Sequence, residues 1–340
     1  MDLPLRRFGA TDMYITRIGF GASALGGGDW ALGWGDQDDV DSIESIHRAL
    51  DGGINWIDTA ALYGLGHSEE VVARAIAGIP DPDRPYVFTK CGIGWDPDDR
   101  DKLPFSNCSP AAIRSTVDGS LRRLGVERLD LCQMHWPSAD GTSLEDYWGT
   151  LVQLRDEGKI RAAGLSNHGR TRLQRAEAVG HVDSLQPPFS AIQRDAAAEL
   201  MPLCAANGTA VIGYSPLEGG LLTGAFSHER MASLTEDDDR RTRREYTADL
   251  DGNLQIAAAM KRVADERGVP IPAIAVAWAL AFPELTGSIV GARTARQVES
   301  WLPAMHFELD GSEIEAIGRA IDVAGTGSGP SRPTGDRSNA

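Results

Sequence analysis

Short apolar runs alternate with amphipathic segments along most of the chain. Runs rich in aliphatic and β-branched residues predict strands, and those without polar alternation predict strands buried on both faces. Each such run is followed by a segment with helical periodicity, so strand–helix units repeat. The expected strands are Arg17–Gly21, Asn55–Asp58, Tyr86–Lys90, Leu129–His135, Ala162–Ser166, Ser184–Gln186, Ala210–Tyr214 and Ser288–Gly291.

Three of the intervening segments carry clear helix signals. Gly52 can end the first helix, while Ser109-Pro110 and Gly125 are typical of the start and end of the second. The third is closed by Gly158. Their apolar stripes are Val40, Ile43, Ile46 and Leu50; Ile113, Val117, Leu121 and Leu124; and Leu144, Trp148, Leu151 and Leu154.

Repeated strand–helix units predict an α/β protein with a parallel sheet, and closure into a (β/α)8 TIM barrel is the economical arrangement. A doubly wound open sheet is the alternative. Two short runs, Leu5–Phe8 and Tyr14–Ile18, bracket Gly9 and predict an N-terminal β-hairpin that plugs the barrel floor. We expect one barrel domain over residues 1–325, followed by a disordered tail over 326–340 that is rich in Gly, Ser, Pro and Arg.

Composition narrows the class of protein. Hydrophobic residues make up 42% and charged residues 24%, as in an ordinary globular domain. The net charge of −16 argues against nucleic-acid binding, which needs a basic surface. We find no membrane span or signal peptide, and four scattered cysteines suggest reduced thiols. The sequence therefore predicts a cytoplasmic protein without nucleic-acid or membrane partners; it does not set the oligomeric state.

The candidate chemistry lies at the carboxyl ends of neighbouring strands, where barrel active sites are built. Asp58 ends the second strand and Tyr63 follows it, Lys90 ends the third, and His135 ends the fourth. Taken alone, each has a structural explanation, such as a loop cap, a packing ring or a solvated surface group. Their convergence on adjacent strand ends favours a catalytic site.

Several motifs in order resemble the aldo-keto reductase superfamily, in a bacterial-type form with a short C-terminal loop. They are Asp58-Thr-Ala-Ala-Leu-Tyr63-Gly, the strand-ending Lys90, Gln133-Met-His135, Gly164-Leu-Ser-Asn167, Gln186 and Tyr214-Ser-Pro-Leu-Glu-Gly-Gly-Leu-Leu222. The resemblance covers about Leu5 to Leu302. It implies an enzyme that moves a hydride between NAD(P)H and an aldehyde, ketone or sugar.

Proton chemistry assigns roles to four residues. Tyrosine keeps its proton at neutral pH, so Tyr63 is the expected general acid in reduction and general base in oxidation. A nearby ammonium lowers a phenol pKa, so Lys90 is expected to tune Tyr63, and Asp58 to hold Lys90. His135 is expected to polarise the carbonyl oxygen.

By resemblance, Ser166, Asn167 and Gln186 hold the nicotinamide carboxamide and Tyr214 stacks on the ring. The remaining cofactor residues expected are Gly21, Ala22, Ser215, Pro216, Leu217, Gly219, Gly220, Leu222, Gly291, Arg293 and Gln297. The segment Gly19-Phe-Gly-Ala-Ser-Ala24 matches the dinucleotide fingerprint G-x-G-x-x-A, but the glycines that follow prevent the helix which that motif requires.

Arg293 lies where a helix is expected to begin after the last strand, a place suited to a ribose 2′-phosphate. We therefore expect NADP, with NADPH preferred over NADH. The sequence departs from the family here, because Ser300 and Trp301 replace the usual Glu-Asn pair. Adenine contacts are accordingly left unassigned.

The substrate side is less specific. Trp30, Trp95 and Trp136 on the loops after strands one, three and four are expected to line the pocket for a small carbonyl or sugar substrate. The charged segment 227–251 is either a lid or a solvated excursion. The remaining histidines lack metal-ligand spacing and are interpreted as surface or packing residues, so no metal is expected.

Two other functions fit parts of the pattern. A cofactor-sensing binding subunit, similar to the potassium-channel β-subunits, would bind the nucleotide but turn over slowly. A barrel glycosidase needs two carboxylates at the bond that it cleaves, and only Asp58 lies at a suitable strand end.

Overall fold

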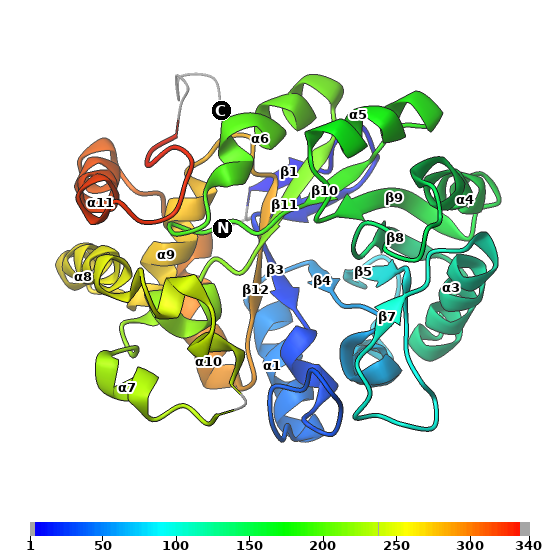
Figure 1. The fold of residues 1–340 in the computed structure, drawn as a ribbon, viewed down its shortest axis with the longest axis horizontal. Helices are drawn as coiled ribbons and strands as arrows, with labels where there is room; N and C mark the ends of the chain where they lie inside the picture. Colours follow the sequence, from blue (N-terminus) through cyan, green and yellow to red (C-terminus); the bar gives the residue numbers. More distant parts are fainter. Residues whose placement is uncertain (1–3, 237, 334–340) are drawn as a thin grey trace.

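The computed structural model describes residues 4–236 and 238–333. Its centre is a closed barrel of parallel strands that follow one another in sequence order, with β12 closing against β3 (Figure 1). The fold is thus the expected (β/α)8 barrel and not the open sheet. The barrel strands are β3 (Ile18–Gly21), β4 (Trp56–Asp58), β5 (Tyr86–Cys91), β8 (Leu129–Met134), β9 (Ile160–Ser166), β10 (Ser184–Gln186), β11 (Ala210–Tyr214) and β12 (Gly287–Gly291).

Helices surround this barrel (Figure 1). The Asp38 side chain caps the first, and Ser109 caps the third, which ends at Gly125 in the left-handed conformation as expected. Val40, expected on the apolar face of the first, is 62% exposed. The helices are α1 (Asp39–Asp51), α2 (His67–Ile76), α3 (Pro110–Leu124), α4 (Leu144–Asp156), α5 (Arg170–Val179), α6 (Asp195–Asn207), α7 (His228–Ala232), α8 (Leu250–Arg267), α9 (Ile271–Leu280), α10 (Ala295–Trp301) and α11 (Gly311–Ala324).

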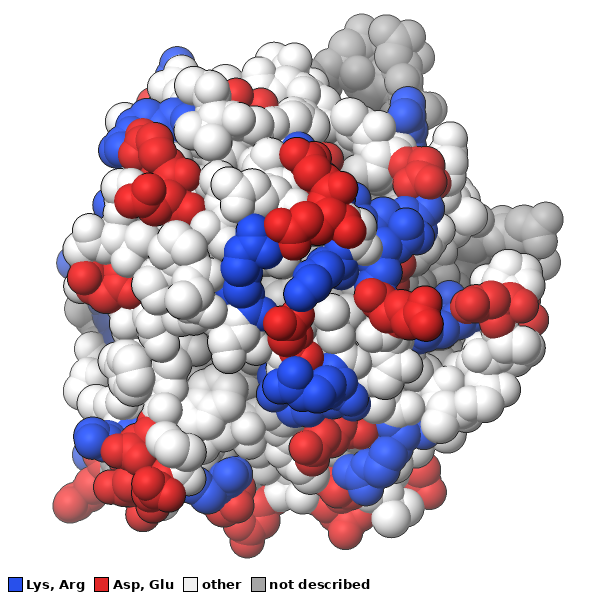
Figure 2. Space-filling model, turned by 90° about the vertical axis from the view of Figure 1, so that its right-hand side faces the viewer, with Lys and Arg blue, Asp and Glu red and all other residues white. Residues whose placement is uncertain are grey.

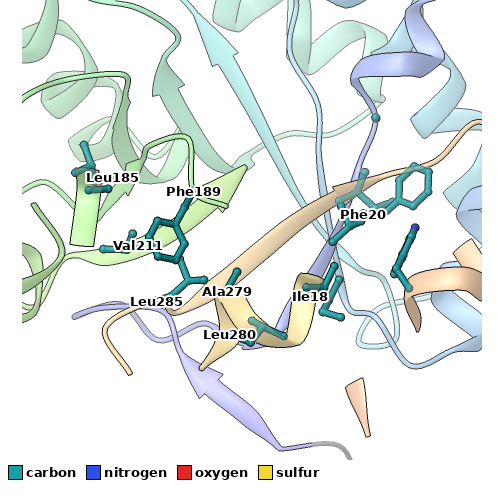
Figure 3. Close-up of a cluster of buried hydrophobic side chains, with 14 of the residues drawn as sticks. Ile18, Phe20, Leu185, Phe189, Val211, Ala279, Leu280 and Leu285 are labelled. Carbon is teal, nitrogen blue, oxygen red and sulfur yellow. The ribbon is translucent and has the colours of Figure 1, made fainter. Parts of the chain in front are cut away.

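The main hydrophobic core lies between the outer face of the barrel and the helices. Figure 3 shows part of it, including Ile18 and Phe20 of β3, Val211 of β11, and Ala279 and Leu280 of α9. Both faces of these short strands are buried, which explains why their sequences are continuously apolar.

The barrel interior has its own core, and the N-terminal hairpin closes it from below. Strands β1 (Leu5–Arg7) and β2 (Tyr14–Thr16) pair antiparallel, and Phe8 between them contacts Phe88 inside the barrel. The Trp56 indole donates a 2.9 Å hydrogen bond to the Thr16 carbonyl. This confirms the expected hairpin and leaves the carboxyl ends of the strands as the open end.

The end of the described chain makes specific contacts. Arg194 donates to the Thr326 carbonyl at 3.0 Å, and Arg332 pairs with Glu315 and with Asp322, both at 2.7 Å. Residues 326–333 thus differ from the disordered tail expected from composition, which ignores such pairing. The remainder of that tail, residues 334–340, lies outside the described residues.

Acidic and basic side chains are interspersed on the face that includes α3 and α4 (Figure 2). Ion pairs such as Arg114–Glu157 and Lys159–Asp118 connect α3 with the residues that follow α4. In the described part of the chain, every helix is too short or too polar to cross a lipid bilayer.

Candidate active site

Three neighbouring strands carry the polar cluster at the open end of the barrel. Asp58 is the last residue of β4, Lys90 the second-last of β5, and His135 directly follows β8. Tyr63 begins the short 3₁₀ turn Tyr63–Gly66 after β4. Because parallel strands end at the same edge, these side chains converge as the sequence predicted.

Close backbone packing fixes the turn that carries Tyr63. Gly64 has a φ of 62°, and a Cβ built on it would lie 2.2 Å from the Gly26 carbonyl oxygen. A side chain there would therefore push the loop after β3 away from the turn. The two glycines hold Tyr63 against the mouth of the barrel.

Asp58 and Lys90 form a buried ion pair. The ammonium lies 2.5 Å from Asp58 Oδ1 and donates to the Thr59 carbonyl at 2.9 Å, while both side chains are almost fully excluded from solvent. Desolvation alone would favour their neutral forms, so mutual attraction must hold the charges in place. Asp58 thus holds Lys90, as expected.

Tyr63 lies next to this pair. Lys90 Nζ is 3.4 Å from the Tyr63 hydroxyl and 5.2 Å from its ring centroid. The His135 ring meets the Tyr63 ring edge-on, with centroids 5.6 Å apart and planes at 81°. The phenol of Tyr63, the ammonium of Lys90 and the imidazole of His135 therefore lie close together at the open end of the barrel.

Burial and charge set the protonation of these groups. Burial lowers the pKa of Lys90, but Asp58 and Tyr63 outweigh it, so this pKa is raised above its ordinary 10.5. Burial, with Lys90 beside it, holds the pKa of His135 well below 6.5, so the imidazole is neutral. Burial also raises the pKa of Tyr63 above 10.0, against the lowering by Lys90. The expected net lowering of the Tyr63 pKa was therefore wrong, because it ignored desolvation.

The residues expected to hold the carboxamide meet at the ends of β9 and β10. Ser166 donates to the Gln186 carbonyl at 3.0 Å, and the Asn167 side chain donates to the carbonyl of His135 at 2.9 Å. Gln186 Nε2 also donates to Asp58 Oδ2 at 2.9 Å. The Tyr214 hydroxyl donates to Asn167 Oδ1 at 2.8 Å. The structure thus brings these four residues together and links them to the polar cluster.

The loop expected to hold the pyrophosphate, Ser215–Leu222, has an unusual backbone. Glu218, Gly219 and Gly220 all have positive φ, of 48°, 54° and 100°. Leu217, with a φ of −94°, and Glu218, with a φ of 48°, form a right-handed/left-handed pair of the kind found in anion-binding nests. Ser215 is exposed, whereas Pro216 and Leu222 are buried and anchor the loop.

Tyr246 and Arg243, two residues of the charged segment 227–251, pack on this loop. Tyr246 is fully buried, and its hydroxyl donates to the Glu218 carbonyl. Arg243 Nη2 donates to Glu218 Oε1 at 3.1 Å, and Ser190 donates to Glu218 Oε2 at 2.7 Å. The segment is therefore attached to the predicted cofactor loop rather than being only a solvated excursion.

Residues at the junction of β3 and β12 border the same end. Gly21 pairs with Asp58 and Gly291, and Ala22 N–H donates to the Asp58 carbonyl at 2.8 Å. After β3 comes a 3₁₀ turn, Ser23–Gly26, and the next α-helix begins only at Asp39. The apparent dinucleotide fingerprint therefore opens no α-helix, as expected.

Arg293 precedes α10 but is turned toward the loop after β3. Its guanidinium donates to Gln37 Oε1 at 2.7 Å and to the Trp34 and Asp36 carbonyls. Gln297 Oε1 accepts from the Arg293 N–H at 2.7 Å. A cavity of about 600 Å³ opens here and is lined by Asp36, Gln37, Asp38, Asp41, Arg293, Thr294 and Gln297.

The unusual pair after Gln297 does not face this cavity. Trp301 is 1% exposed and belongs to the hydrophobic core, and the Ser300 hydroxyl donates to the Gln297 carbonyl at 2.7 Å.

The three tryptophans assigned to the substrate are unequally placed. Trp136 is 49% exposed beside His135, Trp95 is partly buried after the short hairpin strand β6 (Ile93–Gly94), and Trp30 is only 6% exposed. The Trp30 indole donates to the Gly27 carbonyl at 3.2 Å. Trp30 thus packs the loop after β3 and offers little surface to a substrate.

Sequence reasoning missed two features of the site. It gave Asp58 one partner, Lys90, whereas the carboxylate also accepts a hydrogen bond from Gln186 on the opposite side of the barrel. It also grouped His168 with surface or packing residues; His168 is indeed a packing residue, 2% exposed, but its hydrogen bonds at both ring nitrogens were not foreseen. The available signal was its position directly after Asn167.

The donor set matches the parts of a nicotinamide dinucleotide. Amide and hydroxyl groups on β9 and β10 can exchange hydrogen bonds with a carboxamide, and Tyr214 offers a ring beside them. The right-handed/left-handed pair Leu217–Glu218 suits a pyrophosphate. The residues present therefore fit such a cofactor.

Comparison with known proteins is consistent with this geometry. The sequence model described as the aldo/keto reductase family matches residues 17–322. A relative from Escherichia coli (strain K12), described as NADH-specific methylglyoxal reductase, is 33% identical over 314 residues, covering 90% of this chain and 94% of the relative. Another from Bacillus subtilis (strain 168), described as aldo-keto reductase YhdN, is 32% identical over 321 residues, covering 91% and 92%.

A solved structure shows the same architecture. The glycerol dehydrogenase AKR11B4 from Gluconobacter oxydans superposes with a TM-score of 0.84 at 33% identity, covering 94% of this chain and 95% of that one.

Proposed function

Because the chain belongs to the aldo/keto reductase family, we propose that it transfers a hydride between a nicotinamide cofactor and the carbonyl or alcohol carbon of a small substrate. The observation that carries this proposal is the contact chain from Asp58 through Lys90 to Tyr63 at the open end of the barrel. In it, Tyr63, the proposed proton donor, lies beside the Asp58–Lys90 ion pair and close to residues that fit a nicotinamide.

The protein's part in reduction is to place the carbonyl and deliver a proton. A bound nicotinamide cofactor supplies the hydride. The neutral His135 ring donates an N–H hydrogen bond to the carbonyl oxygen, where negative charge develops. Tyr63, whose pKa is raised by burial, holds its proton until that oxygen becomes basic, and Lys90 stabilises the phenolate that remains.

The same proposal assigns cofactor binding to the residues at the ends of β9 to β11 and to the loop after β11. Ser166, Asn167 and Gln186 orient the carboxamide, Tyr214 stacks on the ring, and the loop Ser215–Leu222 binds the pyrophosphate. Segment 227–251 steadies this loop through the contacts of Arg243 and Tyr246 with Glu218.

NADPH is the cofactor we propose, on the basis of Arg293. Its guanidinium is engaged by a neutral amide and two carbonyls, and no carboxylate pairs with it among the described residues. Its positive charge at the start of α10 is therefore available to a 2′-phosphate. The E. coli relative is described as NADH-specific, so the preference has to be measured directly.

Small carbonyl compounds are the substrates we propose, such as methylglyoxal and the aldehyde or ketone related to glycerol. Support comes from the activities in the names of the E. coli and Gluconobacter relatives. We propose a cytoplasmic location because all four cysteines are buried free thiols.

The test is a cofactor-oxidation assay with a panel of aldehydes, ketones and sugars, run on the wild type and Tyr63→Phe. We expect turnover by the wild type and a loss of at least about a hundredfold in Tyr63→Phe, with cofactor affinity nearly unchanged. Tyr86→Phe, at the opposite end of β5, is the matched control and should retain full activity.

Equal activity in Tyr63→Phe would remove Tyr63 as the acid. Tight cofactor binding by the wild type without turnover of any carbonyl would favour a cofactor-sensing subunit instead.

A further inference from the structure

A buried hydrogen-bonded pair lies directly behind the predicted carboxamide site. His168 follows Asn167 in the chain, and Tyr147 belongs to α4 on the outside of the barrel. Each is 2% exposed, and their rings meet edge-on with centroids 5.8 Å apart. His168 Nε2 lies 2.8 Å from the Tyr147 hydroxyl, and His168 Nδ1 lies 2.7 Å from the Ser166 carbonyl oxygen.

The partners determine the direction of both hydrogen bonds. A carbonyl oxygen only accepts, so Nδ1 carries the hydrogen and donates to Ser166. In the neutral ring Nε2 is then an acceptor, and the Tyr147 hydroxyl donates to it. Burial lowers the pKa of His168 to about 4 and raises the pKa of Tyr147 to about 12, so both rings are neutral near pH 7.

The carbonyl that His168 holds belongs to the last residue of β9. The next residue, Asn167, has a φ of 63°, in the left-handed region that non-glycine residues rarely adopt. Its N–H donates to the Gln186 carbonyl at 3.1 Å, and its side chain meets His135 and Tyr214. The hydrogen bond from His168 to Ser166 spans Asn167 and so restrains its backbone.

We propose that His168 and Tyr147 are positioning residues, which hold the Ser166–Asn167 peptide in the geometry that receives the nicotinamide carboxamide. This inference rests on the proposed function, which assigns Ser166 and Asn167 to that carboxamide. Both rings are buried, so neither is expected to touch the cofactor itself. They act through the backbone: Tyr147 on α4, outside the barrel, holds His168, and His168 holds the Ser166 carbonyl at the end of β9.

Three variants separate this role from simple packing. His168→Leu removes both hydrogen bonds, Tyr147→Phe removes only the outer one, and His168→Asn places an amide N–H where Nδ1 donates to Ser166. Affinity is measured by fluorescence titration with NADPH and NADH. Adenosine diphosphoribose, which lacks the nicotinamide, is titrated in parallel to report the rest of the site.

We expect His168→Leu to weaken binding of the reduced cofactor by about tenfold, the equivalent of one hydrogen bond at about 1.4 kcal/mol. Its affinity for adenosine diphosphoribose should be unchanged. Tyr147→Phe should show a smaller loss of the same selective kind. His168→Asn should recover most of the lost affinity, because it restores the donor to Ser166.

A loss below about twofold in both His168→Leu and Tyr147→Phe overturns the inference. So does an equal loss for adenosine diphosphoribose, which would mean general disruption, or a His168→Asn variant as weak as His168→Leu. Asn167→Ala in the same titrations distinguishes the two proposals. If Asn167→Ala binds NADPH and NADH normally, the carboxamide assignment itself is wrong; if it is weakened while the His168 variants are not, only the present inference fails.

Discussion

The buried ion pair offers the sharpest test of the site's electrostatics, through Asp58→Asn. At the observed 2.5 Å, the attraction between Asp58 and Lys90 is about 7 kcal/mol for an effective dielectric of about 20. Much of it offsets the cost of burying both charges. Removing one partner of such a pair leaves the other charge uncompensated and typically costs about 3–5 kcal/mol. We expect the free energy of unfolding to fall by at least about 3 kcal/mol near neutral pH.

The pH dependence of this loss is the decisive part. In the wild type the pKa of Lys90 is raised above 10.5, so its stabilisation is fully present below pH 10.5 and is lost only as the pH rises through the folded pKa. Without the carboxylate, burial dominates and depresses that pKa. In the variant, Lys90 then carries a proton in the unfolded state that it has lost in the folded state. The free energy of unfolding of the variant therefore rises with pH up to 10.5, by about 1.4 kcal/mol per pH unit.

The assay is urea unfolding of both proteins at several pH values from about 7 to about 10. Asp118→Asn is the matched control, because Asp118 and Lys159 form a half-exposed pair whose loss should cost less than about 1 kcal/mol. Lys90→Met added to Asp58→Asn should recover part of the stability. A loss below about 1 kcal/mol, or a gap between wild type and variant that does not narrow as the pH rises, would refute the reasoning.

Three further outcomes follow from the structure. Arg293→Ala should weaken NADPH far more than NADH in binding titrations, with Arg296→Ala on the exposed face of α10 as control; equal losses for both cofactors would contradict the 2′-phosphate assignment. The pKa of Tyr63 is raised above 10.0 and that of His135 is lowered well below 6.5, so neither group titrates between about pH 7 and about pH 9. We therefore expect kcat/KM for reduction to stay constant across this range, and a bell-shaped pH profile within it would contradict the assignment. Phe8→Ala should lower unfolding free energy by about 3–5 kcal/mol in denaturant titrations without changing KM, because Phe8 fills the barrel floor; a changed KM would show that the floor and the site are coupled.

The barrel could be predicted from sequence because its strands are largely buried, and some of them, such as β3 and β11, are uninterrupted apolar runs. The polar cluster was predictable for a related reason: Asp58, Lys90 and His135 all fall where such a run ends, and parallel strands bring those ends together. Both inferences need only the local pattern and the rule that the strands are parallel.

What the sequence did not predict depends on contacts between distant segments. The turn of Arg293 toward Gln37 joins residues from opposite ends of the chain. The buried environment of His168 depends on α4, whose Tyr147 has no special place in the sequence pattern. The net rise in the Tyr63 pKa required knowing how completely the site excludes water, which residue types alone do not reveal.

The carboxylate of Asp58 divides its two oxygens between Lys90 and Gln186. In the proposed mechanism, the strength of the acid and the recognition of the nicotinamide therefore both depend on this one side chain. A change at residue 58 that altered the acidity of Tyr63, the proposed proton donor, would also release the Gln186 amide, the proposed carboxamide ligand. New substrate preferences in this lineage are thus expected to arise in the loops around the barrel mouth, where Trp136 and its neighbours can vary without disturbing that shared group.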